Sequence, residues 1–251
     1  MDNTQQGHVN TTINNSIATI SFYHPAHNSL PANLLSALTE QIMAVGNDPS
    51  VSVVILKSEG DRTFCAGASF DELKAIQDIE SGKQFFSGFA NVINAMRKCP
   101  KFIIGRVHGK AVGGGVGLAA ASDYCMATMN ATTKLSELAI GIGPFVIGPA
   151  VERKMGLSAF SQMAINATEW VTADWAKQKG LFTEVFETTE RLDAYIAHFA
   201  DILKLSSPEA MRQLKSILWA GTEHWDHLLA ERAAISGQLV LSDFAKKAIA
   251  K

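Results

Sequence analysis

Three consecutive glycines, Gly113 to Gly115, constrain this sequence more than any other stretch. They follow an apolar run over 102–107 that is typical of a buried strand, and they precede the apolar run 116–122, which predicts a buried helix. Because glycine has no side chain, a ligand can approach such a turn closely, and the first N–H groups of a helix have no partner within it. The stretch therefore predicts a strand, a turn and a helix start at which a ligand meets the main chain.

A second turn of small residues, Cys65 to Ala68, also stands at the end of a predicted strand. In α/β folds, ligands gather at the carboxyl ends of strands. One N–H group from each turn could converge on a carbonyl oxygen and stabilise the negative charge that develops on it. Two ordinary tight turns would give the same pattern, so spacing alone leaves both interpretations open.

Glu137 is the only charged residue in an apolar, glycine-rich segment that runs from 137 to 149. A carboxylate among apolar neighbours loses hydration, which raises its pKa toward the value that suits a general base. A surface glutamate or a helix cap is the alternative for this position.

The composition predicts a globular protein with a sizeable core, because 47% of its 251 residues are hydrophobic and only 18% are charged. The net charge of -2 gives no reason to expect nucleic acid or an anionic membrane as a partner. Three scattered cysteines are typical of reduced thiols in a cytoplasmic protein. We predict no metal site, since His224 and His227 have no clear third ligand. No signal peptide and no membrane-spanning run are expected.

Strands and helices alternate through the first two thirds of the chain, which predicts an α/β fold with crossovers, and the last third is helical. The expected extended segments are a hairpin over 9–23 and runs at 51–57, 102–107, 123–128, 132–136 and 183–186. The expected helices cover 31–45, 70–79, 81–98, 116–122, 149–155, 158–166, 172–180, 189–204, 207–220, 223–238 and a tail from 243.

The sequence resembles the crotonase superfamily, also called the enoyl-CoA hydratase/isomerase family. The motifs that carry the resemblance are 64–73, 108–115 with Asp123, 135–142, 172–181 and 206–208, in family order along nearly the whole chain. The resemblance implies a ββα-superhelix core over residues 1–190 that binds acyl-CoA and carries out catalysis. It also implies a helical region over 191–251 that serves assembly and covers the site. Trimers or dimers of trimers are expected as homo-oligomers, and CoA is expected to enter with the substrate, without a separate cofactor.

By motif position, the resemblance implies three catalytic residues: the N–H groups of Ala68 and Gly114 would hold the thioester oxygen, and Glu137 would move a proton. The residues expected to bind substrate are Asn28, Ser29, Leu30, Ala66, Gly67, Gly113, Gly117 and Phe145. Lys246, Lys247 and Lys251 could meet CoA phosphates, although a solvated face explains them equally well. The aromatic residues Phe70, Phe85, Phe86, Phe89 and Phe145 could shape an acyl pocket, with core packing as the favoured interpretation.

One departure from the family pattern bears on the reaction. Hydratases of the family carry two glutamates, whereas this sequence has Gly117 at the first position and Glu137 at the second. A single carboxylate can move a proton between two carbons of one substrate, as in the Δ3,Δ2-enoyl-CoA isomerases that the segment 138–145 also resembles. Isomerisation is the favoured reaction. The alternatives are hydration with Asp71, Glu72 or His108 assisting, and decarboxylation, although a structural role is favoured for His108.

Two further hypotheses come from other classes of function, of which only the first stays open. A catalytically silent acyl-CoA binder would also keep the glycine turn and lack an acid at Gly117. A dinucleotide-binding module is disfavoured, since the glycine cluster lacks the final glycine or alanine of that fingerprint.

Overall fold

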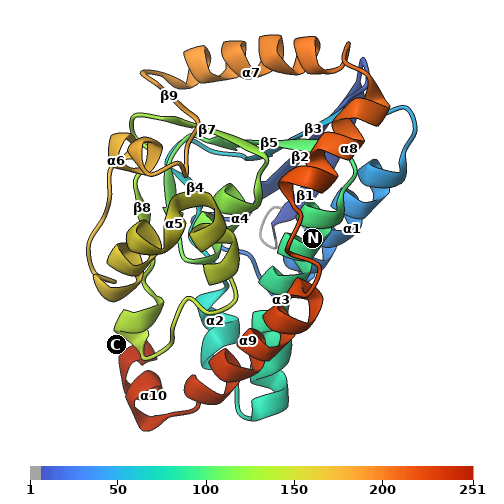
Figure 1. The fold of residues 1–251 in the computed structure, drawn as a ribbon. Helices are drawn as coiled ribbons and strands as arrows, with labels where there is room; N and C mark the ends of the chain where they lie inside the picture. The colour runs from blue at the N-terminus through green and yellow to red at the C-terminus, as the bar shows by residue number, and fades with distance from the viewer. Residues whose placement is uncertain (1–6, 251) are drawn as a thin grey trace.

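The computed structural model of the chain describes residues 7–250, which form two sheets surrounded by helices (Figure 1). The larger sheet has the order β1-β2-β3-β5-β7-β9, and the smaller one has the order β4-β6-β8. The strands of the larger sheet are β1 (His8–Asn14), β2 (Ile17–Tyr23), β3 (Val53–Ser58), β5 (Phe102–Val107), β7 (Tyr124–Thr128) and β9 (Glu184–Phe186). Those of the smaller sheet are β4 (Thr63–Cys65), β6 (Lys110–Val112) and β8 (Thr133–Lys134).

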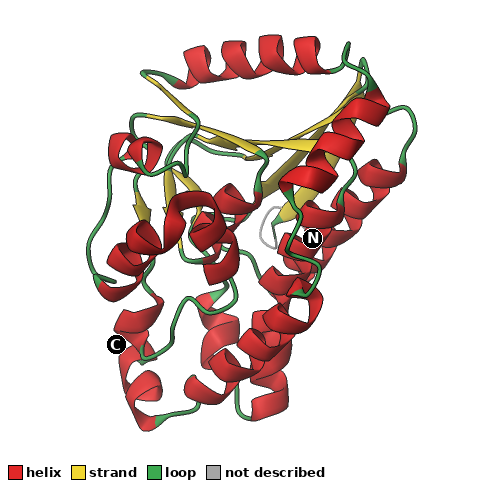
Figure 2. Cartoon of the chain, viewed as in Figure 1, coloured by secondary structure: helices red, strands yellow, loops and turns green. Residues whose placement is uncertain are grey.

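Only the first pair of strands is antiparallel; the other pairs of both sheets are parallel. The β1–β2 hairpin turns at Asn15 and Ser16, which both have positive φ. Parallel strands need crossover connections, and these are helical here. The predicted α/β architecture is therefore confirmed, and Figure 2 shows the strands enclosed by helices.

The helices are, in chain order, α1 (Ala32–Asn47), α2 (Phe70–Lys74), α3 (Ile79–Lys98), α4 (Gly114–Ala121), the 3-10 helix η2 (Glu137–Ile140), α5 (Gly148–Ile165), α6 (Ala173–Gln178), α7 (Thr189–Leu203), α8 (Pro208–Leu218), α9 (Trp225–Leu239) and α10 (Asp243–Ile249). Within residues 7–250, no helix combines the length and the apolar character that a bilayer crossing requires.

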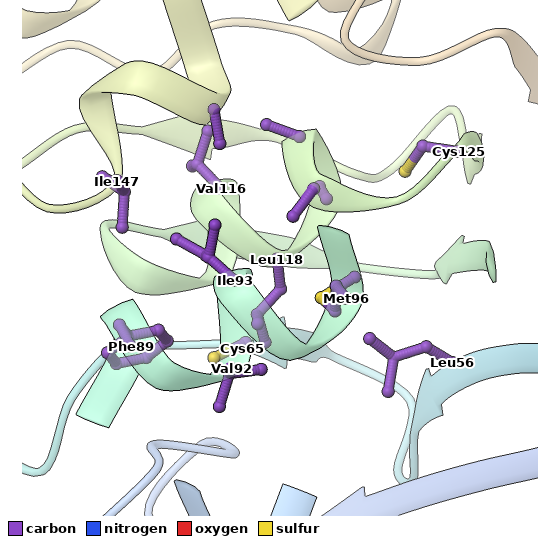
Figure 3. Close-up of a cluster of buried hydrophobic side chains, with 14 of the residues drawn as sticks. Leu56, Cys65, Phe89, Val92, Ile93, Met96, Val116, Leu118, Cys125 and Ile147 are labelled. Atoms are coloured by element: carbon purple, nitrogen blue, oxygen red, sulfur yellow. The ribbon is translucent and has the colours of Figure 1, made fainter. Parts of the chain in front are cut away.

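The larger sheet is covered on both faces, as its apolar strands predict. Val53, Ile104 and Met126 pack against Leu192 and Ile196 of α7, which lies across one face of the sheet (Figure 1). The alternate residues of the same strands point into the main core, which includes side chains of α1, α3 and α4. Figure 3 shows part of this core, where α3 and α4 pack together. This core is the rigid support on which the glycine turn sits.

The structure differs from the expected elements in three places. The expected helix 70–79 ends at Lys74, and α3 begins at Ile79, because Asp78 caps the helix and exchanges hydrogen bonds with Ser81. Strands β4 and β6 of the smaller sheet were not expected; they pair with each other, and β6 also pairs with β8. The two helices expected at 149–166 form one element, α5, that kinks at Gly156, where φ is 79°.

Candidate active site

A largely apolar cavity of about 290 Å³ lies where the two small-residue turns meet η2 and helices α2, α3 and α9. Its wall consists of Ala66, Gly67, Ala68, Phe70, Leu73, Phe85, Phe86, Phe89, Val112, Gly113, Gly114, Ser136, Glu137, Ile140, Ile142, Gly143, Pro144, Phe145, Val146, Ile147 and Ser236. A concave apolar site with a few polar groups is the usual form of a small-molecule site.

The two turns approach each other closely at this cavity. Gly67 has a φ of 90°, and a Cβ atom on it would lie 3.6 Å from the Gly114 nitrogen. Among residues 7–250, neither the Ala68 N–H group nor the Gly114 N–H group donates a hydrogen bond to another backbone group. Gly114 is the first residue of α4, so the positive end of that helix also faces the cavity. The arrangement provides two free donors at one place, as an oxyanion site requires.

The carboxylate of Glu137 lies directly beside the glycine turn. Gly113 has a φ of 51°, a conformation that strongly favours glycine, and a Cβ atom there would come within 2.8 Å of Glu137 Oε1. Any side chain at position 113 would therefore have to displace the carboxylate. Glycine is needed here both for the backbone conformation and for the space.

Burial gives Glu137 the protonation behaviour of a general base. Its Oε2 atom is fully buried and has no hydrogen-bond partner among the described residues, although the residue as a whole is only half-buried. This burial raises the pKa of Glu137 to about 7. A carboxyl group that titrates near neutrality is well suited to take and return a proton.

The position of the missing second acid is occupied by another side chain. A Cβ atom on Gly117 would lie 2.6 Å from Ile147 Cγ2 and 3.6 Å from Ile93 Cδ1. Figure 3 shows Ile147 and Ile93 in the packed cluster around α4. A glutamate at position 117 would need Ile147 to move, so the space has been filled by hydrocarbon.

Comparison with known proteins decides the family. The model of the family "Enoyl-CoA hydratase/isomerase" matches residues 12–250. The chain belongs to the enoyl-CoA hydratase/isomerase family. Among curated relatives, the methylglutaconyl-CoA hydratase of Mus musculus is 32% identical over 200 residues, which cover 78% of this chain and 63% of that protein. The short-chain-enoyl-CoA hydratase of Clostridium acetobutylicum is 29% identical over 209 residues, which cover 82% of this chain and 79% of the relative.

Solved structures of the family share the fold. An enoyl-CoA hydratase from Bacillus halodurans superposes with a TM-score of 0.89 at 22% identity, covering 96% of this chain and 98% of that chain. One from Mycobacterium avium gives 0.86 at 26% identity, covering 100% and 96%. The crotonase-like fold with a helical C-terminal region is thereby confirmed.

Most of the residues predicted to be catalytic or to bind substrate lie together in the structure. Ala68, Gly114 and Glu137 share the cavity wall with the predicted substrate-binding residues Ala66, Gly67, Gly113 and Phe145. Gly117 lies behind that wall, because Ile147 stands against it and itself lines the cavity.

Asn28, Ser29 and Leu30 are buried outside the cavity wall and brace the turn that carries Ala68. The Leu30 N–H group donates to the carbonyl of Gly67 at 2.8 Å. The side chain of Asn28 donates at 2.8 Å to the carbonyls of both Glu59 and Thr63. This segment therefore fixes the position of one of the two predicted oxyanion donors, and its contact with CoA stays a prediction.

The other acids and the histidine considered at this site lie off the cavity wall. Glu72 Oε2 accepts a hydrogen bond from the Ala32 N–H group at 2.9 Å, and Asp71 is exposed. His108 is buried, and its Nδ1 lies 3.0 Å from Nη1 of Arg106. Burial, with the neighbouring Arg106, lowers the pKa of His108 to about 4. Glu72 and His108 thus make contacts outside the cavity, and Asp71 is exposed to solvent.

Sequence reasoning missed two hydroxyl groups and underestimated the aromatic residues. Ser136 and Ser236 both line the cavity. No local signal marks Ser236, which lies on α9, far along the chain from the glycine turn. Phe70, Phe85, Phe86 and Phe89, for which core packing was the favoured interpretation, line the cavity together with the predicted substrate-binding residue Phe145. A phenylalanine run gives the same pattern for a core and for an apolar pocket, so sequence alone could not separate the two uses.

Two weaker predictions concern the last third of the chain. Lys246 and Lys247 lie in the last turn of α10, and Lys251 lies outside the described residues. Among residues 7–250, no group of three or more His, Cys, Asp or Glu side chains is arranged to hold a metal ion. His227 instead faces Glu231 one helical turn away, at 3.5 Å.

Proposed function

We propose that this protein moves the double bond of an enoyl-CoA thioester, with Glu137 as the group that carries the proton. One observation carries the proposal: of the described residues that line the cavity, only Glu137 bears a carboxyl, imidazole or amine group, and it lies beside Ala68 and Gly114. The proposed reaction follows from the chemistry that Glu137 and these two N–H donors can carry out together.

The proposed reaction needs only the groups on this wall. The N–H groups of Ala68 and Gly114 donate to the thioester carbonyl oxygen, which gains negative charge when a neighbouring carbon loses a proton. The Glu137 carboxylate takes the C2 proton of a 3-enoyl-CoA, and the electron pair spreads over the thioester and the double bond. The same carboxyl group then returns the proton at C4, which gives the 2-enoyl-CoA.

Hydration is the second candidate, because the relatives named above are called hydratases. Adding water across a double bond requires a group to activate water and a group to protonate C2. The side chain space at Gly117 is filled by Ile147, and Glu72 is held by the Ala32 N–H group. A single carboxylate therefore favours isomerisation over hydration.

The two reactions are separated by incubating the purified protein with a 3-enoyl-CoA and, separately, with a 2-enoyl-CoA. We expect the 3-enoyl-CoA to give the conjugated 2-enoyl-CoA, observed by the absorbance of the conjugated thioester and by chromatography. The 2-enoyl-CoA is expected to give no 3-hydroxyacyl-CoA. Formation of the hydroxyacyl product with no isomerisation would replace the proposal by hydration.

The pH dependence of this reaction follows from the pKa of Glu137. A general base acts in its ionised form, and burial raises this pKa to about 7. We therefore expect kcat/KM to increase about tenfold per pH unit below 7 and to level off above it. A profile that is flat between pH 5 and pH 8 would contradict the assignment of Glu137 as the base.

We also propose a homo-oligomer, with trimers or dimers of trimers as the family resemblance implies. The single chain leaves several large apolar side chains of α8 at least half exposed, namely Leu214, Ile217 and Leu218. Such side chains are suited to contacts between copies of the chain.

A further inference from the structure

The cavity has two ends, which are defined by helix α3. At one end the ring of Phe89 packs against Gly114, so this end carries the predicted oxyanion donors. Gly82 lies two helical turns earlier, which corresponds to about 10 Å along the helix axis. Phe85 and Phe86 line the cavity between these positions, with their rings 5.0 Å apart. The cavity therefore extends from the donors along α3 toward Gly82.

At the far end, α9 crosses α3 in direct backbone contact. A Cβ atom on Gly82 would lie 2.8 Å from Gly237 Cα, and one on Gly237 would lie 2.5 Å from the Lys83 nitrogen. Neither position has room for a side chain. The crossing also fixes the position of Ser236, the residue before Gly237, which is buried and lines the cavity.

The wall offers no positive charge at this end. Its one charged member among the described residues is Glu137, which is negative when ionised. Lys74 lies over the ring of Phe70, 5.4 Å from its centroid, and Lys83 is exposed; neither belongs to the wall. The hydroxyl of Ser236 already donates to the Arg232 carbonyl at 3.2 Å.

We propose that Ser236 closes the acyl end of the cavity and makes the protein selective for neutral aliphatic acyl chains of limited length. This inference rests on the proposed function, in that an acyl-CoA occupies the cavity. A chain that ends in a carboxylate would bury its charge without a cationic partner, which is strongly unfavourable. A longer chain would collide with α9, which the Gly82–Gly237 contact holds against α3.

The test measures binding of saturated acyl-CoAs by titration calorimetry, because these compounds bind without reacting. For the unaltered protein, we expect affinity to rise from butanoyl-CoA with chain length and then to fall. Glutaryl-CoA is expected to bind at least about tenfold more weakly than pentanoyl-CoA. Equal affinities for this pair would overturn the inference.

Variants at position 236 test whether Ser236 is the residue that determines this selectivity. We expect Ser236→Leu to weaken the longest chains that the unaltered protein binds by about tenfold or more and to leave butanoyl-CoA unchanged. Ser236→Lys is expected to reverse the preference between glutaryl-CoA and pentanoyl-CoA, since it adds the missing cation. Gln238→Leu, an exposed position on the same helix, is the matched control and is expected to change nothing.

Circular dichroism checks that each variant is folded, and Ser236→Ala gives a second, milder change if Ser236→Leu does not fold. It is expected to tighten binding of the longest chains relative to butanoyl-CoA. Equal weakening of all chain lengths by the folded variants would overturn the role of Ser236. If acyl-CoAs bind with the expected selectivity while the 3-enoyl-CoA is not converted, the proposed reaction is wrong and the role of Ser236 in selectivity is retained.

Discussion

Replacing Glu137 by Gln is expected to reduce isomerisation by about 10²–10⁴-fold, with acyl-CoA binding retained. Glutamine keeps the size of the side chain beside Gly113 but can neither take nor return a proton. The measurement is kcat and KM for a 3-enoyl-CoA in the variant and the unaltered protein. Glu72→Gln is the matched control, because Glu72 is a nearby acid that lies off the cavity wall. Activity that survives in Glu137→Gln would exclude Glu137 as the proton carrier.

Glu137→Gln is also expected to be more stable than the unaltered protein at high pH. A loss of activity in this variant would therefore not result from unfolding. The folded-state pKa of Glu137 is about 7, whereas the ordinary value is 4.5. Between these values the folded protein retains a proton that the unfolded chain releases, so stability falls as the pH rises. The loss is complete above pH 7 and amounts to at most about 3 kcal/mol. We expect thermal unfolding at pH 8 to show a higher Tm for Glu137→Gln, and at pH 4 to show no such gain.

The parts of the fold that the sequence predicted well are those that local physics determines. The strand β5 (Phe102–Val107) has the bounds expected from its apolar run, and β1 and β2 form the hairpin expected over 9–23. Gly113 and Glu137 were each singled out from their neighbours alone. The apolar segment around Glu137 correctly indicated a raised pKa, because burial follows from the residues that surround the side chain.

The parts that could not be predicted depend on contacts between distant segments. Strand β6 has only three residues, and it exists because β4 and β8 pair with it. The absence of an acid at Gly117 was visible in the sequence, but its replacement by Ile147 was not. Ser236 reaches the cavity through a crossing of two helices whose contact residues are both glycines. Such tertiary contacts leave no periodic pattern from which they could be inferred.

Asp123 is a further residue whose role, here in stability, depends on contacts between distant segments. In the sequence, Asp123 is part of a family motif and has no assigned role, whereas the structure places its carboxylate in a buried network of hydrogen bonds. Asp123 Oδ2 lies 2.8 Å from Lys215 Nζ and accepts the Ile103 N–H group at 2.7 Å. Asp123 Oδ1 accepts the indole N–H group of Trp219 at 2.7 Å. Lys215 also donates to the carbonyls of Met96 and Lys101, at 3.0 Å and 2.8 Å. The network joins α8 to the end of α3 and the start of β5.

Lys215→Met is expected to lower the free energy of unfolding by about 3–5 kcal/mol, because it leaves the buried Asp123 carboxylate without its cation. Methionine retains most of the buried hydrocarbon, so the loss reports the charge and the hydrogen bonds. The measurement is urea unfolding followed by circular dichroism. Lys98→Met is the matched control: Lys98 pairs with Asp226 on the surface, where such a pair contributes about 0–1 kcal/mol.

The double variant Lys215→Met/Asp123→Asn tests whether the two charges act as a pair. Asparagine keeps an oxygen for Trp219 or Ile103 and has no charge that requires Lys215. We expect the double variant to be less destabilised than the sum of the two single variants, by about 1–3 kcal/mol, which is the signature of direct coupling. Strict additivity would show that α8 is held by packing and by the two carbonyl contacts of Lys215. In that case the buried ion pair would contribute little to the attachment of the helical C-terminal region to the sheet.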